Sequence, residues 1–177
     1  MIHLITGGER SGKSRYAQRL ALAQTNRPLY LATARRTAYD DSFEQRIIRH
    51  QQERDARWTT REEPLYVSTV LPREGVVVMD CVTLWLTNWF TKHQYRREET
   101  LDAVRQEFDR IDHQHTLLLI VTNEVGMGLH ATTEVGRDFV ELQGWINQHI
   151  AQRAQQVTLM VSGLPLTVKE VSPSRMP

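Results

Sequence analysis

The sequence predicts an α/β protein built on a mostly parallel sheet flanked by helices. Its short apolar runs are continuous rather than alternating, which is typical of strands buried on both faces. Longer polar stretches with helical spacing separate these runs, and such alternation indicates βαβ units. We expect strands at Ile2–Thr6, Leu29–Thr33, Val76–Met79, Leu117–Thr122 and Val157–Val161. We expect helices at Arg15–Ala23, Phe43–Arg54, Glu98–Asp112 and Arg137–Ala154.

Composition narrows the class of protein. The chain of 177 residues is the usual size of one domain, so we treat 1–177 as a single unit. Its formal net charge of +1 supplies no basic field for nucleic acid, and no apolar run approaches the roughly 18 residues of a membrane span. The one cysteine, Cys81, fits a reducing compartment. We therefore expect a cytoplasmic protein that binds neither nucleic acid nor membrane.

An aromatic segment, Leu84–Phe90, has two interpretations. Trp85, Trp89 and Phe90 lie close together in it, so one face of a helix here is strongly apolar. That face packs either into the core of the chain or against a second subunit. The sequence leaves both interpretations open.

The strongest local motif follows the first expected strand and matches Gly-x-x-x-x-Gly-Lys-Ser. Gly7 and Gly12 allow backbone angles that turn successive N–H groups inward around a phosphate. Lys13 reaches the β and γ phosphates, and the Ser14 hydroxyl is suited to ligate Mg²⁺. The motif predicts a P-loop NTPase-like fold that binds a purine nucleoside triphosphate. The candidate nucleotide-binding residues here are Gly7, Gly8, Glu9, Arg10, Ser11, Gly12, Lys13 and Ser14.

Asp80 ends the apolar run 76–79 and is the candidate carboxylate for the same metal. P-loop proteins carry such a carboxylate at the end of a neighbouring strand. An aspartate in this place can also cap the following helix. We expect the metal role, with Ser14 and Asp80 as the residues that bind Mg²⁺.

Arg46, His50 and Arg54 are spaced four apart and share one face of an expected helix. Flanking guanidinium groups disfavour the imidazolium, which leaves a neutral nitrogen available near neutral pH. The same cations offset charge on a phosphate under attack. The spacing is compatible with a nucleophilic histidine, although a solvated polar face has the same pattern.

The motifs, taken together and in order, resemble those of the bifunctional adenosylcobinamide kinase/adenosylcobinamide-phosphate guanylyltransferases. The resemblance extends along nearly the whole chain, and all of its motifs except the P-loop are specific to that family. They are Gly7–Ser14; Arg46 and Ile47 with His50, Arg54, Trp58, Thr60, Glu62, Glu63 and Pro64; Asp80–Asn88; Thr122–Gly128; and Ser162–Pro165 with Lys169.

The resemblance implies two reactions. The first phosphorylates the aminopropanol hydroxyl of adenosylcobinamide with a nucleoside triphosphate, GTP or ATP. The second joins GMP from GTP to that phosphate through a guanylylated histidine, and the matching position is His50. The corrinoid is larger than this domain can enclose, and the family forms ring-like homotrimers. We therefore expect a homotrimer.

The resemblance also implies roles for the other candidates. Arg46 and Arg54 would steady the phosphates, while Lys13 with Ser14-bound Mg²⁺ would hold the leaving pyrophosphate and Asp80 would order the metal. By the same resemblance Glu62 belongs to the GTP site, where it would pair with guanine or bind the ribose. The alternative is that Glu62 is only a solvent-exposed charge. We also count Thr33 among the nucleotide-binding residues.

The segment Asn123–Gly128 follows an expected strand and so belongs at the carboxyl edge of the sheet. It is either a capped glycine-rich turn or a contact to the nucleotide or the corrinoid arm, and its role stays unassigned. A P-loop kinase of a small metabolite without nucleotidyl transfer is the alternative function. A GTP-binding switch is less favoured because no Asn-Lys-x-Asp motif is present.

Overall fold

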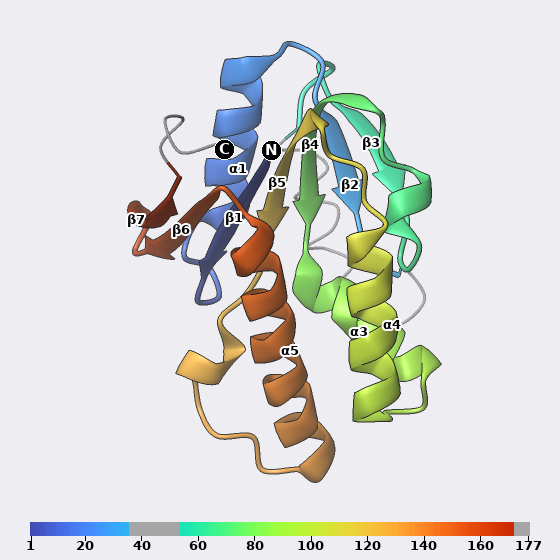
Figure 1. Ribbon diagram of the computed structural model, residues 1–177. Helices are drawn as coiled ribbons and strands as arrows, with labels where there is room; N and C mark the ends of the chain where they lie inside the picture. Colours follow the sequence, from blue (N-terminus) through green and yellow to red (C-terminus); the bar gives the residue numbers. More distant parts are fainter. Residues whose placement is uncertain (36–53, 172–177) are drawn as a thin grey trace.

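The computed structural model describes residues 1–35 and 54–171, and its centre is one sheet (Figure 1). Seven described strands form it in the order β3-β2-β4-β5-β1-β6-β7. All neighbouring pairs are parallel except β6 and β7, so the predicted mostly parallel α/β fold is confirmed. The strands are β1 (Ile2–Gly7), β2 (Leu29–Ala32), β3 (Thr59–Glu62), β4 (Glu74–Asp80), β5 (His115–Val121), β6 (Gln156–Val161) and β7 (Leu164–Glu170).

The order of the strands decides which residues meet at the carboxyl edge, the lower edge of the sheet in Figure 1. β1 lies near the middle and pairs with β5 on one side and β6 on the other. β5 therefore separates β1 from β4, whose pairing runs to Asp80 opposite Val121. The loops after β1, β4 and β5 consequently open at one edge, where ligands bind in parallel sheets.

Helices cover both faces of the sheet. On one face α3, α4 and α5 pack over the larger core, which includes Trp85, Phe108 and Ile146. On the other face α1 packs through Ala17 and Ala21. The helices are α1 (Lys13–Gln24), α3 (Val82–Lys92), α4 (Arg97–Asp109) and α5 (Glu134–Arg153), with short 3-10 turns η1 (Val67–Thr69) and η2 (Val125–Met127). None of the helices within the described ranges is long and apolar enough to cross a membrane.

The aromatic segment lies in α3 and belongs to the core. Trp85 is fully buried, Trp89 and Phe90 are nearly so, and all three join the larger hydrophobic cluster. The indole N–H groups of Trp85 and Trp89 both donate to the carbonyl of Leu65. Of the two interpretations, the structure supports packing within the chain.

Candidate functional site

The loop that joins β1 to α1 has the backbone that the glycine pattern predicts. Gly7 has a φ of +148° and Gly12 a φ of +93°, both in the region that favours glycine. A Cβ at Gly7 would lie 2.5 Å from the carbonyl oxygen of Met160, so no side chain fits there. At the far end, the N–H of Gly163 donates to the carbonyl of Ser11. The turn after β6 thus supports the loop from outside.

Lys13 begins α1, and its side chain is directed back toward the loop. The residue is buried, and its Nζ donates to the carbonyl of Gly8 at 2.6 Å. Ser14 follows in the first turn, where the backbone N–H groups of the helix and its dipole favour an anion. The Lys13 ammonium and the start of the helix therefore both lie against the loop.

Asp80 ends β4, two strands from the loop-bearing β1. Its Oδ2 accepts a hydrogen bond of 2.9 Å from the hydroxyl of Tyr30 on β2. Burial raises the pKa of Tyr30 well above its usual value, and the adjacent Asp80 carboxylate raises it further. Tyr30 therefore stays a protonated donor that orients Asp80. Sequence reasoning missed Tyr30 because an aromatic residue in a buried strand is ordinarily only core.

Arg54 lies against the other side of Tyr30. Its guanidinium carbon is 3.8 Å from the ring centroid, a cation–π contact. Its Nη1 is buried and has no hydrogen-bond partner among the described residues. Arg46 and His50 lie outside the described residues, so their position relative to Arg54 stays a prediction.

Thr33 and Glu62 follow neighbouring strands at the same edge. Thr33 is fully buried, and its hydroxyl both donates to the carbonyl of Cys81 and accepts from the Cys81 N–H. Thr33 thereby supports the backbone directly after Asp80. Glu62 ends the edge strand β3 opposite Ala32, and its side chain is exposed.

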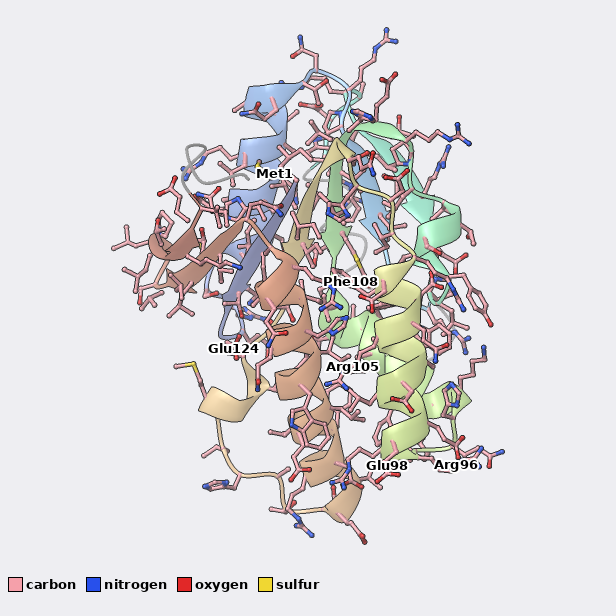
Figure 2. The ribbon with its side chains drawn as sticks, in the orientation of Figure 1. Met1, Arg96, Glu98, Arg105, Phe108 and Glu124 are labelled. Carbon is pink, nitrogen blue, oxygen red and sulfur yellow. The ribbon has the colours of Figure 1, made fainter. Side chains whose placement is uncertain are left out.

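The segment after β5 contributes a further carboxylate beside the loop. Glu124 accepts hydrogen bonds from Thr6 and Asn147 at its Oε1, and its N–H donates to the carbonyl of Gly7. Figure 2 shows Glu124 beside the loop that follows β1, on the side of α5. Sequence reasoning located the segment at this edge. It missed Thr6 and Asn147, because neither belongs to a recognisable motif.

The donor set at this edge fits a hard cation. Ser14 offers a hydroxyl and Asp80 a carboxylate, which are oxygen ligands of the kind Mg²⁺ takes. Mg²⁺ usually keeps several waters and needs only one or two protein ligands beside the phosphates. Across residues 1–35 and 54–171, no cluster of three or more His, Cys, Asp and Glu side chains could hold a metal. Cys81 is buried, which raises its pKa to about 12, so its thiol remains protonated.

These motifs match a family model over residues 3–168, described as cobinamide kinase / cobinamide phosphate guanyltransferase. The chain belongs to this family. In this cobinamide kinase / guanyltransferase, Lys169 donates to the carbonyls of Ala151 and Gln152 near the end of α5. That residue therefore has a structural role.

Two curated relatives of this cobinamide kinase / guanyltransferase match over nearly their whole length. One is the bifunctional adenosylcobalamin biosynthesis protein CobP of Pseudomonas aeruginosa, 38% identical, with 96% of this chain and 98% of the relative covered. Another is the bifunctional adenosylcobalamin biosynthesis protein CobU of Escherichia coli, 32% identical, with 96% and 100% covered. The chain is accordingly an enzyme with kinase and guanylyltransferase activities.

Solved structures with low sequence identity share the fold. The flagellar accessory protein FlaH of Methanocaldococcus jannaschii is 16% identical with a TM-score of 0.53, covering 96% of this chain and 78% of that one. A structure from Pyrococcus horikoshii is 9% identical with a TM-score of 0.50, covering 98% and 88%. At such identities the likeness supports the α/β fold of this cobinamide kinase / guanyltransferase and nothing further.

Proposed function

We propose that one P-loop site serves both reactions of this enzyme. In the first, a nucleoside triphosphate, ATP or GTP, phosphorylates the aminopropanol hydroxyl of adenosylcobinamide. In the second, GMP from GTP is joined to the new phosphate, giving adenosylcobinamide-GDP and pyrophosphate. The observation that carries the proposal is the arrangement at the carboxyl edge of the sheet. There the loop 7–14 follows β1, Asp80 ends β4, and Arg54 contacts Tyr30 of β2.

The loop would hold the triphosphate. The inward backbone of Gly7–Gly12 and the start of α1 provide N–H donors, and Lys13 provides a buried cation. Glu9 and Arg10 lie exposed on the rim of the loop. Ser14 and Asp80 would hold Mg²⁺, which supplies charge neutralisation at the phosphates when bound. Tyr30 fixes one oxygen of Asp80, Oδ2, by its hydrogen bond.

Guanylyl transfer would proceed through His50. Its ring nitrogen attacks the α-phosphorus of GTP, and the bond to the leaving pyrophosphate breaks. The phosphate oxygen of adenosylcobinamide phosphate then displaces the histidine, so that two easier steps replace one. Arg46 and Arg54 would offset the charge that develops on the phosphate. Among the described residues the buried Nη1 of Arg54 has no acceptor, which supports this role, because a buried guanidinium donor is costly without one.

Two further residues complete the proposed nucleotide site. Glu62, exposed at the end of β3, would accept hydrogen bonds from guanine or ribose. Thr33 would act indirectly and not by contact with the nucleotide, because its hydroxyl is already hydrogen-bonded to the backbone of Cys81. Its contribution to nucleotide binding would be to fix the segment that carries Asp80.

We also propose a cytoplasmic homotrimer. Support for a subunit contact comes from the edge strand β7, where Leu164, Leu166 and Val168 are each more than half exposed. Unpaired strand edges with apolar side chains are usually covered by another chain. Light scattering on the purified chain would test this, and a monomeric mass would contradict it.

The first experiment on function looks for the covalent intermediate. The purified protein is incubated with Mg²⁺ and GTP labelled at the α phosphate, then denatured. We expect an acid-labile, base-stable adduct that is absent from His50→Ala. If no adduct forms but γ phosphate passes to adenosylcobinamide, the chain is a kinase only and the role of His50 is wrong.

A further inference from the structure

Hydrogen bonds hold one oxygen of the Glu124 carboxylate, Oε1, in place. Oε1 accepts a short hydrogen bond of 2.6 Å from Thr6 Oγ1 on β1 and one of 3.2 Å from Asn147 Nδ2 on α5. Within the described ranges, no hydrogen bond reaches Oε2. The residue is partly exposed, at the carboxyl edge of the sheet.

A buried polar network sets the position of Asn147. Its Oδ1 accepts from Thr122 at 2.7 Å and from Gln143 at 2.9 Å, so its amide can only direct Nδ2 outward. That Nδ2 reaches both the carbonyl of Asn123 and the carboxylate of Glu124. Such connected networks hold a side chain in one orientation. β1, β5 and α5 together therefore fix one carboxylate.

The carboxylate lies beside the phosphate loop. The N–H of Glu124 donates to the carbonyl of Gly7, the first residue of the loop, at 3.2 Å. The carbonyl of the next residue, Gly8, accepts from Lys13 Nζ, the group that serves the β and γ phosphates. Glu124 therefore lies beside the loop that would surround the phosphates. Asp80, on a different strand, is directed by Tyr30 instead.

We propose that Glu124 is the general base of the kinase reaction. The substrate hydroxyl oxygen forms a bond to the γ-phosphorus while its proton passes to Oε2 of Glu124. The bond from the γ-phosphorus to the β–γ bridging oxygen breaks, and its electron pair leaves with the nucleoside diphosphate. Guanylylation of His50 has no hydroxyl to deprotonate, so that reaction does not use Glu124. This inference rests on the proposed pair of reactions.

The test compares Glu124→Gln with the unaltered protein in both reactions. The glutamine Oε1 still accepts from Thr6 and Asn147, so a structural role predicts little change, but its amide cannot accept a proton. We expect the kinase kcat, followed with γ-labelled triphosphate and adenosylcobinamide, to fall by about 100-fold or more. The rate of His50 labelling by α-labelled GTP should change by less than about threefold.

Glu134→Gln, which removes an exposed carboxylate from the first turn of α5, is the matched control and should leave both rates unchanged. Equal losses in both reactions of Glu124→Gln would overturn the proposal, because the substitution would then have disturbed the nucleotide site as a whole and not one proton transfer. A fully active kinase in Glu124→Gln would also overturn it, while the proposed function would stand. If the unaltered protein transfers no γ phosphate, the proposed function itself fails, and the base fails with it.

Discussion

At the scale of single residues, Gly7 is the position where the loop least tolerates a side chain. Its φ of +148° is a conformation that costs other residues about 1–3 kcal/mol, and a Cβ would collide with the Met160 carbonyl. We expect Gly7→Ala to lower the free energy of unfolding by at least about 2 kcal/mol and to abolish triphosphate binding. Urea denaturation and equilibrium binding of GTP measure the two effects.

Gly8→Ala is the control for this substitution. A Cβ at Gly8 would meet nothing within 4 Å, although the residue is next in the chain. We expect its unfolding free energy to stay within about 1 kcal/mol of the parent. Equal destabilisation by the two alanines would contradict the close contact with β6.

The positions of candidate residues could be predicted from sequence where the motif is local. Lys13 and Ser14 belong to one contiguous motif, and Asp80 directly ends a recognisable strand. Tyr30, in contrast, acts on a carboxylate 50 positions away, and Thr6 on one 118 positions away. Neither pairing leaves a pattern in the sequence, because it depends on which strands become neighbours.

At the scale of elements, α5 has a side-chain cap that can be removed. Thr133 precedes the helix, and its Oγ1 accepts from the N–H of Gly136 at 3.1 Å. We expect Thr133→Ala to lower the free energy of unfolding by about 1 kcal/mol, the usual loss for a threonine cap. Thermal or urea unfolding would measure this loss. Thr132→Ala serves as the control, because the bond from Arg137 to Thr132 uses the backbone carbonyl, which the substitution keeps. If Thr132→Ala lowers the free energy of unfolding as much as Thr133→Ala does, the cap is refuted.

The elements that sequence reasoning identified are the buried ones. Continuous apolar runs marked β1, β2, β4, β5 and β6, with ends displaced by a residue or two. β3 was missed because all its residues are exposed, and a polar edge strand lacks the apolar signal. β7 was missed because it is an exposed antiparallel edge that contains Pro165. The helix expected at 43–54 stays a prediction over 43–53, but its last residue, Arg54, lies in a bend, so the expectation was wrong there.

At the scale of the whole molecule, buried histidines make stability depend on pH. His3 is buried in β1, where its Nε2 lies 2.8 Å from Thr158 Oγ1, and burial lowers its pKa from 6.5 to about 4. Between these values the unfolded chain binds a proton that the folded chain does not. The contribution of His3 to the free energy of unfolding is therefore fully present above pH 6.5. It is lost as the pH falls toward 4, and the loss reaches up to about 3 kcal/mol.

Urea unfolding of the parent and of His3→Gln between pH 7.5 and about 4 tests this prediction. Glutamine can keep a hydrogen bond to Thr158 but does not titrate, so we expect a shallower fall in the free energy of unfolding. Part of the slope should remain, because burial also lowers the pKa of His149. Identical slopes in the two proteins would show that His3 is protonated as easily in the folded state as in the unfolded one.

The position of β1 also determines when the protein can assemble on the ribosome. The strand is made long before its two neighbours, β5 (His115–Val121) and β6 (Gln156–Val161). Pairings so distant in sequence form slowly, and the ribosome adds only about 5–20 residues per second. The phosphate loop is therefore made while its strand is still unpaired, and the strand stays unpaired until β5 and β6 have been made. Bound nucleotide can therefore stabilise the loop only once β5 and β6 have been made and have paired with β1.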